Sequence, residues 1–218
     1  MKNASILYIF LLFPYSLTLS ATTGDLGRTS AMVNIGFAAL EKQSVGNSTN
    51  KDWEDGFSLG ATFTHAFVNN PDIFGYDMRI DYGFSNISKI REEHNFLISS
   101  YSWVDNYQFF KPFVHADIGY ETHHNKDTNG GNSENSLILQ IGLGIENVWT
   151  DGFSTRMYLD KKIAGLDTPA KVGFGTTIWV ADTVGFGIDA VFGFSSDVDS
   201  SQTEESSMDL TTTFGFSF

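Results

Sequence analysis

Residues 136–146 read Ser-Leu-Ile-Leu-Gln-Ile-Gly-Leu-Gly-Ile-Glu, and large apolar side chains occupy every second position from Leu137 to Ile145. The residues between them are polar or glycine, with Ile138 the one large apolar exception. Successive side chains of an extended chain point to opposite faces. The alternation therefore predicts a β-strand with one apolar and one polar face.

The same period of two recurs along the chain from Ser30 onward. It predicts ten strands, at about residues 30–42, 56–68, 75–86, 94–105, 111–123, 135–149, 152–163, 170–181, 184–195 and 207–218. The fourth is the least regular, because Phe96 and Ile98 lie on the face opposite Leu97, Tyr101 and Trp103.

The connections between the expected strands alternate in length. Those after odd-numbered strands are longer and polar, at residues 43–55, 87–93, 124–134, 164–169 and 196–206. Those after even-numbered strands are mostly shorter, as at residues 150–151 and 182–183. Long loops outside and short turns in the periplasm are typical of outer-membrane barrels, and an even strand count leaves both termini in the periplasm.

A soluble β-sandwich is the alternative to a barrel. Strands of soluble sheets usually run about five or six residues, whereas those expected here approach the length that a tilted strand needs to cross a bilayer. We therefore expect an all-β protein that forms an antiparallel up-and-down transmembrane β-barrel of ten strands, with eight strands as the alternative.

In a barrel of this kind the polar face of each strand lines the lumen, where charges of opposite sign have to pair. We expect Arg79 and Arg156 to point inward and to pair with aspartates. His65 departs from the pattern, because it falls on the apolar face of the second strand. The expected lumen charges are Asp77, Arg79, Asp81, His115, Asp117, Glu146, Arg156, Asp160 and Asp189.

The four tryptophans lie near the ends of the expected strands. Trp103, Trp149 and Trp179 are beside short turns, and Trp53 is beside the first long loop. Amphipathic aromatic side chains gather at the two membrane–water interfaces. All four are therefore expected to face the interface.

The N-terminus has the features of an export signal. Lys2 is followed by an apolar run from Ile6 to Leu19 and then by the small residues Ser20 and Ala21. This order is typical of a cleaved secretory signal peptide, and the run is too short to span a bilayer as a helix. We expect a signal peptide at residues 1–21 and a barrel domain at residues 22–218.

Charge and composition exclude several classes of function. The chain has 13 Lys plus Arg against 26 Asp plus Glu, a net charge of −13, and it has no cysteine. Such an acidic chain is unsuited to nucleic acid. The missing cysteines exclude disulfides, thiolate metal sites, a cysteine nucleophile and a lipidated N-terminal cysteine.

Two segments and the C-terminus resemble known outer-membrane barrels. The sequence ends Thr-Phe-Gly-Phe-Ser-Phe, and its alternating Phe214, Phe216 and Phe218 resemble the C-terminal signal read by the outer-membrane insertion machinery, although Thr213 stands where that signal usually has glycine. Residues 111–120 (Lys-Pro-Phe-Val-His-Ala-Asp-Ile-Gly-Tyr) and 146–156 (Glu-Asn-Val-Trp-Thr-Asp-Gly-Phe-Ser-Thr-Arg) resemble strands and turns of the OmpA-like and opacity-type surface barrels. That resemblance covers about residues 30–218. It implies exposure at the cell surface and no shared activity, and these families usually have eight strands.

Three groups of residues have side chains of the types found in catalytic or metal sites. His115 and Asp117 lie on one strand face and would form half of a hydrolytic site with Ser99 or Ser154 as the nucleophile. A hydrogen-bond network in the lumen is the interpretation that we favour. His123 and His124, beside Asp127, point to opposite faces of a strand, and residues 196–205 lack the ligand order of a calcium loop. No metal, cofactor or catalytic site is therefore expected.

The leading functional hypothesis is a non-enzymatic surface barrel of the bacterial outer membrane, acting in envelope integrity, adhesion or protection through its loops. A small porin-like channel is the alternative, because ten strands enclose a lumen between that of a filled eight-stranded barrel and that of a porin. An outer-membrane lipid hydrolase or protease comes third. The expected partners are outer-membrane lipids and lipopolysaccharide, the insertion machinery and an extracellular ligand of the loops.

Overall fold

The computed structural model describes residues 25–44, 52–70, 74–88, 91–104, 109–126, 132–150, 152–166, 170–194 and 203–218. The expected signal peptide at residues 1–21 lies outside these ranges. Within them the chain forms ten strands: β1 (Ser30–Ser44), β2 (Asp52–Asn70), β3 (Phe74–Ile87), β4 (Arg91–Trp103), β5 (Phe110–Asn125), β6 (Asn132–Thr150), β7 (Phe153–Ala164), β8 (Ala170–Val180), β9 (Val184–Phe194) and β10 (Thr203–Ser217).

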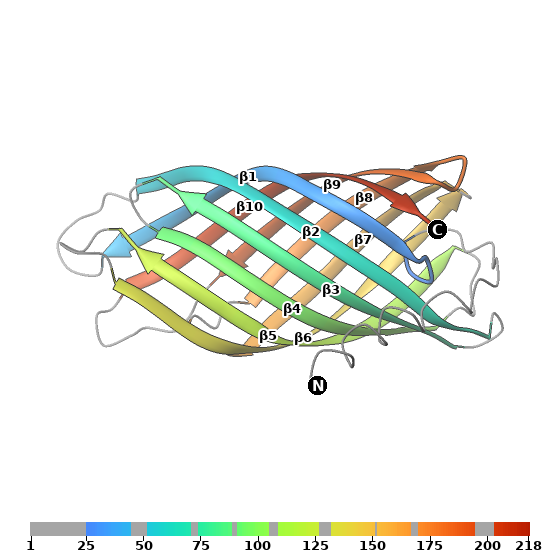
Figure 1. Ribbon diagram of the computed structural model, residues 1–218, viewed down its shortest axis with the longest axis horizontal. Helices are drawn as coiled ribbons and strands as arrows, with labels where there is room; N and C mark the ends of the chain where they lie inside the picture. Colours follow the sequence, from blue (N-terminus) through green and yellow to red (C-terminus); the bar gives the residue numbers. More distant parts are fainter. Residues whose placement is uncertain are drawn as a thin grey trace, which may run out of the picture.

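The strands close into one antiparallel barrel (Figure 1). Each strand pairs with its neighbours in the sequence, and β1 closes the ring by pairing with β10 from Ser30–Ser217 to Ser44–Thr203. The prediction of ten strands is confirmed, and the alternative of eight is not. The irregular fourth strand is present as β4, which pairs along its whole length with β3 and β5.

The two faces of the wall have opposite chemistry, as the alternation predicted. On β6 the side chain of Ile141 points outward and is 51% exposed, whereas Glu146 points into the barrel and is fully buried. The exposed large side chains of the other strands are likewise apolar, as at Phe186 and Ile188 of β9. An apolar exterior around a polar interior is the architecture of a membrane-spanning barrel.

Both ends of the barrel are recognisable from the connections. At one end the turn between β8 and β9 is short, with a hydrogen bond from the Thr183 N–H to the Val180 carbonyl (3.2 Å) and with Ala181 and Asp182 in left-handed conformations (φ 51° and 58°). Phe218 lies at the same end, to the right in Figure 1. We call this the turn end and the opposite end, where β1 stops and β2 starts, the loop end.

No helix in the part of the chain that the structure describes is long and apolar enough to cross a membrane.

Candidate functional site

The candidate site is the lumen, because the structure directs all nine of the expected charged side chains into it. They originate from five of the ten strands and are buried or half-buried. The nine occupy two layers along the barrel: Asp77 and Glu146 lie near the turn end, and the other seven lie in the middle. Their positions follow from the strand alternation, which places residues i and i+2 on the same face.

His115 is at the centre of the middle layer. Its Nδ1 lies 3.0 Å from Oδ1 of Asp117, and its Nε2 lies 2.8 Å from Oδ1 of Asp160. The Gln140 side-chain amide donates to both carboxylates, at 3.0 Å to Asp117 and 3.3 Å to Asp160. The two imidazole nitrogens can donate to both carboxylates at once only when each nitrogen carries a proton.

The ring of Tyr101 connects this histidine to an arginine. Tyr101 stacks on His115 with ring centroids 4.7 Å apart and an angle of 11° between the planes. On the same ring the guanidinium of Arg79 lies 4.2 Å from the centroid. Among the described residues no carboxylate lies within 4.0 Å of the Arg79 guanidinium, so the expected close ion pair with an aspartate is not formed, although the charges of Asp77 and Asp81 on the same strand attract it. A cation–π contact satisfies its charge in part instead.

Arg156 behaves as expected. Its Nη2 lies 3.3 Å from Oδ1 of Asp189, and the guanidinium is 5.6 Å from the ring centroid of Tyr158. On the other side of the lumen the Thr62 hydroxyl donates to Asp81 at 2.7 Å. We refer to the residues of this layer as the central network: Arg79, Asp81, Tyr101, His115, Asp117, Gln140, Arg156, Asp160 and Asp189.

The layer at the turn end holds a segment that precedes β1. The carboxylate of Glu146 accepts the backbone N–H of Asp25 at 2.6 Å and that of Leu26 at 3.2 Å. Asp77 accepts the backbone N–H of Gly27 at 2.8 Å. The two expected lumen carboxylates at this end therefore bind main chain rather than arginine.

The side chains of this segment also contact the wall. Asp25 accepts the Thr177 hydroxyl at 2.8 Å and the Trp179 indole N–H at 2.9 Å. Arg28 lies over the Trp179 ring, 4.5 Å from its centroid, and pairs with Asp182 at 3.5 Å.

Two of the four expected interface tryptophans are inside the barrel. Trp103 is 3% exposed and packs with Leu26 and Phe113, and Trp179 is 4% exposed. The prediction that these two tryptophans face the membrane interface is therefore wrong. Each lies on the same strand face as residues that point into the lumen. Trp53 and Trp149 do point outward, and the indole N–H of Trp149 donates to Thr155 at 2.9 Å.

The outward side chains include the C-terminal aromatics. Phe214 lies 5.2 Å from Phe216 and 5.3 Å from Phe186, ring centroid to ring centroid, and Phe218 is exposed. His65 is also on the outer face, edge-on to Phe67 at 4.6 Å. Its position confirms that the polar residue breaks the apolar face of β2.

Toward the loop end a third set of charges is paired. Glu121 accepts the Lys162 ammonium at 2.6 Å, accepts the backbone N–H of Leu166 at 2.6 Å and faces Nε2 of His123 at 3.4 Å. Glu93 pairs with Arg91 on the same strand. None of these residues is among the lumen charges expected from the sequence.

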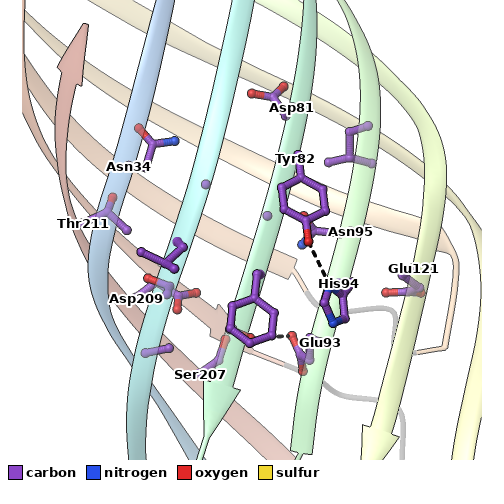
Figure 2. A pocket seen from close by; sticks show the side chains of 18 of the residues that line it. Asn34, Asp81, Tyr82, Glu93, His94, Asn95, Glu121, Ser207, Asp209 and Thr211 are labelled. Carbon is purple, nitrogen blue, oxygen red and sulfur yellow. Dashed lines mark hydrogen bonds between the residues drawn. The ribbon is translucent and has the colours of Figure 1, made fainter.

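Two cavities occupy the space between the layers. The inner cavity, of about 270 Å³, lies between Asp25 and the central network. The outer cavity, of about 320 Å³, extends toward the loop end and is lined by the carboxylates of Asp81, Glu93, Glu121 and Asp209 (Figure 2). The cavities share six lining residues: Asn34, Thr62, Asp81, Leu97, Gln140 and Thr211.

Neither a metal site nor a hydrolytic triad is assembled in the described ranges. They contain no group of three or more His, Asp or Glu side chains that could hold a metal ion. His123 is buried and His124 points outward, where it contacts the Ser133 hydroxyl at 2.9 Å. Asp127 and most of residues 196–205 lie outside the described ranges. Ser99 and Ser154 are buried, on β4 and β7.

No family model matches this chain, and no curated protein matches it. Several solved structures are similar in strand arrangement. The attachment invasion locus protein Ail of Yersinia pestis is 12% identical over 88% of this chain and 99% of that chain, with a TM-score of 0.42. Neisserial surface protein A is 14% identical over 86% and 97%, with a TM-score of 0.42. The outer membrane protease OmpT of Escherichia coli is 7% identical over 91% and 100%, with a TM-score of 0.47. These likenesses are weak, and the fold of this chain rests on its own strand pairing.

Proposed function

We propose that this protein is a non-enzymatic barrel of the bacterial outer membrane whose lumen is closed, and that it serves the cell surface through the loops at its loop end. The exported state is supported by the apolar N-terminal run, and the membrane location by the apolar outer face. Closed barrels span a bilayer because no strand edge is left unpaired in lipid.

The observation that carries the proposal is the central network. Its contacts form two groups. Arg79, Tyr101, His115, Asp117, Gln140 and Asp160 link β3, β4, β5, β6 and β7, and Arg156 pairs with Asp189 between β7 and β9. Polar networks inside a protein rigidify the part that contains them to the extent that their members find partners. A lumen crossed by such contacts suits a barrel that supports surface loops rather than one that passes solutes.

The same network argues against the hydrolase alternative. A general base needs a ring nitrogen free to take the proton of the serine nucleophile. Both nitrogens of His115 face carboxylates, at 3.0 Å and 2.8 Å. Ser99, the nearer candidate by strand register, is opposite Asp117 rather than His115.

The proposed partners follow from the two surfaces. The apolar exterior is suited to outer-membrane lipids and lipopolysaccharide, and the outward aromatics Phe214, Phe216 and Phe218 to the insertion machinery. A ligand of the loops is the third proposed partner.

Fractionation together with two activity assays tests the proposal. We expect the protein in outer-membrane fractions, with heat-modifiable migration on gels, and we expect the refolded protein to hydrolyse neither phospholipid nor peptide. Steady conductance of the refolded protein in planar bilayers would favour the channel alternative, and hydrolysis that is lost on His115→Phe would favour an enzyme.

A further inference from the structure

Residues 25–29, the five residues before β1, lie across the turn end of the lumen. Their polar groups reach several separate strands: Asp77 on β3, Glu146 on β6, Thr177 and Trp179 on β8, and the backbone N–H of Ala66 on β2, which donates to the Thr29 hydroxyl at 3.2 Å. The Thr29 carbonyl accepts the N–H of Phe218 at 3.1 Å. A segment anchored on so many sides covers the opening rather than one part of its rim.

Leu26 is the apolar part of this cover. Its side chain has no exposed surface and packs with Trp103 and Phe113, against which Tyr101 and Tyr158 also lie. The aromatic residues come from β4, β5 and β7, so Leu26 packs against one side of the lumen wall. Burial of the leucine side chain stabilises the segment in place, and that contribution is lost when the segment leaves.

The inner cavity lies directly behind the segment, because Asp25 is one of its lining residues. Six residues, among them Asp81 and Gln140, line both the inner and the outer cavity. The segment lies between the inner cavity and the turn end of the barrel. It lies outside the strand ladder, so it can leave without breaking the closed sheet.

We propose that residues 25–29 form a releasable plug, and that withdrawal of the plug converts the closed barrel into a narrow pore that prefers small cations. This goes beyond the proposed function, which concerns the closed barrel alone. The preference follows from the inner cavity, whose wall carries five carboxylates (Asp25, Asp81, Asp117, Asp160 and Asp189) against two guanidinium groups and one imidazole (Arg79, Arg156 and His115).

Two substitutions loosen the plug by different routes. Leu26→Asp places a carboxylate among the aromatic rings, where an unpaired charge is strongly disfavoured. Glu146→Gln weakens the acceptor of two backbone N–H groups of the plug. Losing a charge-assisted hydrogen bond should raise the open fraction by about tenfold to a hundredfold.

Glu121→Gln is the matched control. Glu121 is also a buried glutamate that accepts a backbone N–H from outside the strands, at Leu166, but it lies toward the loop end. All variants are compared with the wild type as refolded protein in planar bilayers, after heat-modifiable migration has shown that each barrel has closed.

The wild type and Glu121→Gln should stay shut, whereas Leu26→Asp and Glu146→Gln should conduct steadily, with a reversal potential in a salt gradient that shows cation preference. A wild type that conducts as steadily as its variants would overturn the plug and would also contradict the closed barrel. Steady conductance of Glu121→Gln would also overturn the plug, because it would show that loss of a buried carboxylate opens the barrel even away from the segment.

A second measurement covers variants that stay shut. The chain has no cysteine, so Leu26→Cys is a unique label site. Its reaction with a thiol reagent should be slow, and should accelerate by about tenfold or more when Glu146→Gln is added. Fast labelling with no conductance would show that the central network blocks the lumen by itself, which overturns the pore while leaving the proposed closed barrel intact.

Discussion

The imidazole of His115 on β5 and the carboxylate of Asp160 on β7 lie 2.8 Å apart, although β6 runs between their strands. The residue of β6 in register with both is Gly142. A Cβ atom on Gly142 would collide with Nε2 of His115 and with Oδ1 of Asp160. The hydrogen bond therefore depends on a glycine in the strand that it crosses.

The first prediction concerns this glycine. Gly142→Ala should lower the free energy of unfolding in urea by about 3 kcal/mol, because it overpacks the lumen and separates His115 from Asp160. Gly187→Ala on β9 is the control, since its added Cβ would approach other atoms no closer than 3.1 Å. Equal effects of the two substitutions would show that the His115–Asp160 contact contributes little.

The pair of Arg156 and Asp189 repeats the arrangement across β8, where Gly175 is in register with both. Arg156→Leu should destabilise the barrel by about 3 kcal/mol, because it leaves the Asp189 carboxylate without its partner. Membrane targeting should not change, since the lipid-facing side chains are intact. The double variant Arg156→Leu with Asp189→Leu should recover most of the loss, and additive losses in this cycle would rule out coupling between the two residues.

Ala181 carries backbone strain in the turn between β8 and β9. Its φ of 51° is unfavourable for alanine, whereas asparagine tolerates the left-handed region. Ala181→Asn should therefore raise the free energy of unfolding by about 1 kcal/mol. Ala181→Val should lower it, because a β-branched residue resists this conformation. A gain from valine would mean that the turn adopts another geometry.

Phe218 is exposed on the outer face, and its backbone N–H donates to the Thr29 carbonyl at 3.1 Å. Phe218→Ala should reduce the amount of barrel assembled in the membrane of cells, while the refolded protein keeps its midpoint in urea. Phe194→Ala, on the outer face of β9 toward the loop end, should leave assembly unchanged. Normal assembly of Phe218→Ala would mean that the resemblance of the C-terminus to an insertion signal has no function here.

The strands and faces could be predicted from the sequence because both are local properties. A period of two is complete within one strand, and it assigns inside and outside without knowledge of the neighbours. That is why the alternation predicts correctly that Glu146 and Asp160 lie in the lumen. The alternation is least regular on β4, because Leu97, Tyr101 and Trp103 put large side chains on its inner face.

For the tryptophans, strand parity and proximity to a turn predict different positions. Trp179 alternates with Thr177 and Gly175 on the polar face of β8, so strand parity places it in the lumen. Its position beside a turn suggested the interface instead. Parity outweighs proximity to a turn in this case, because Asp25 gives the buried indole N–H an acceptor.

The plug could not have been predicted in the same way. Residues 25–29 read Asp-Leu-Gly-Arg-Thr and have no periodicity, and their position depends on contacts such as that from Asp25 to Glu146, 121 residues away. The contact of Arg79 with the Tyr101 ring could not be predicted from the sequence for a related reason. Aspartates flank it on β3, but the face that it contacts is the ring of Tyr101 on the next strand.

The central claim is that the barrel has an apolar outer face and a polar lumen. Lipid contact along one strand tests this claim most directly. Single cysteines introduced at Gln140 and Ile141 of β6 would carry a fluorophore in protein refolded into vesicles that contain brominated lipid. We expect strong quenching at Ile141, which is exposed on the outer face, and little at Gln140, which contacts Asp117 and Asp160 inside. Equal quenching at the two positions, or stronger quenching at Gln140, would contradict the account.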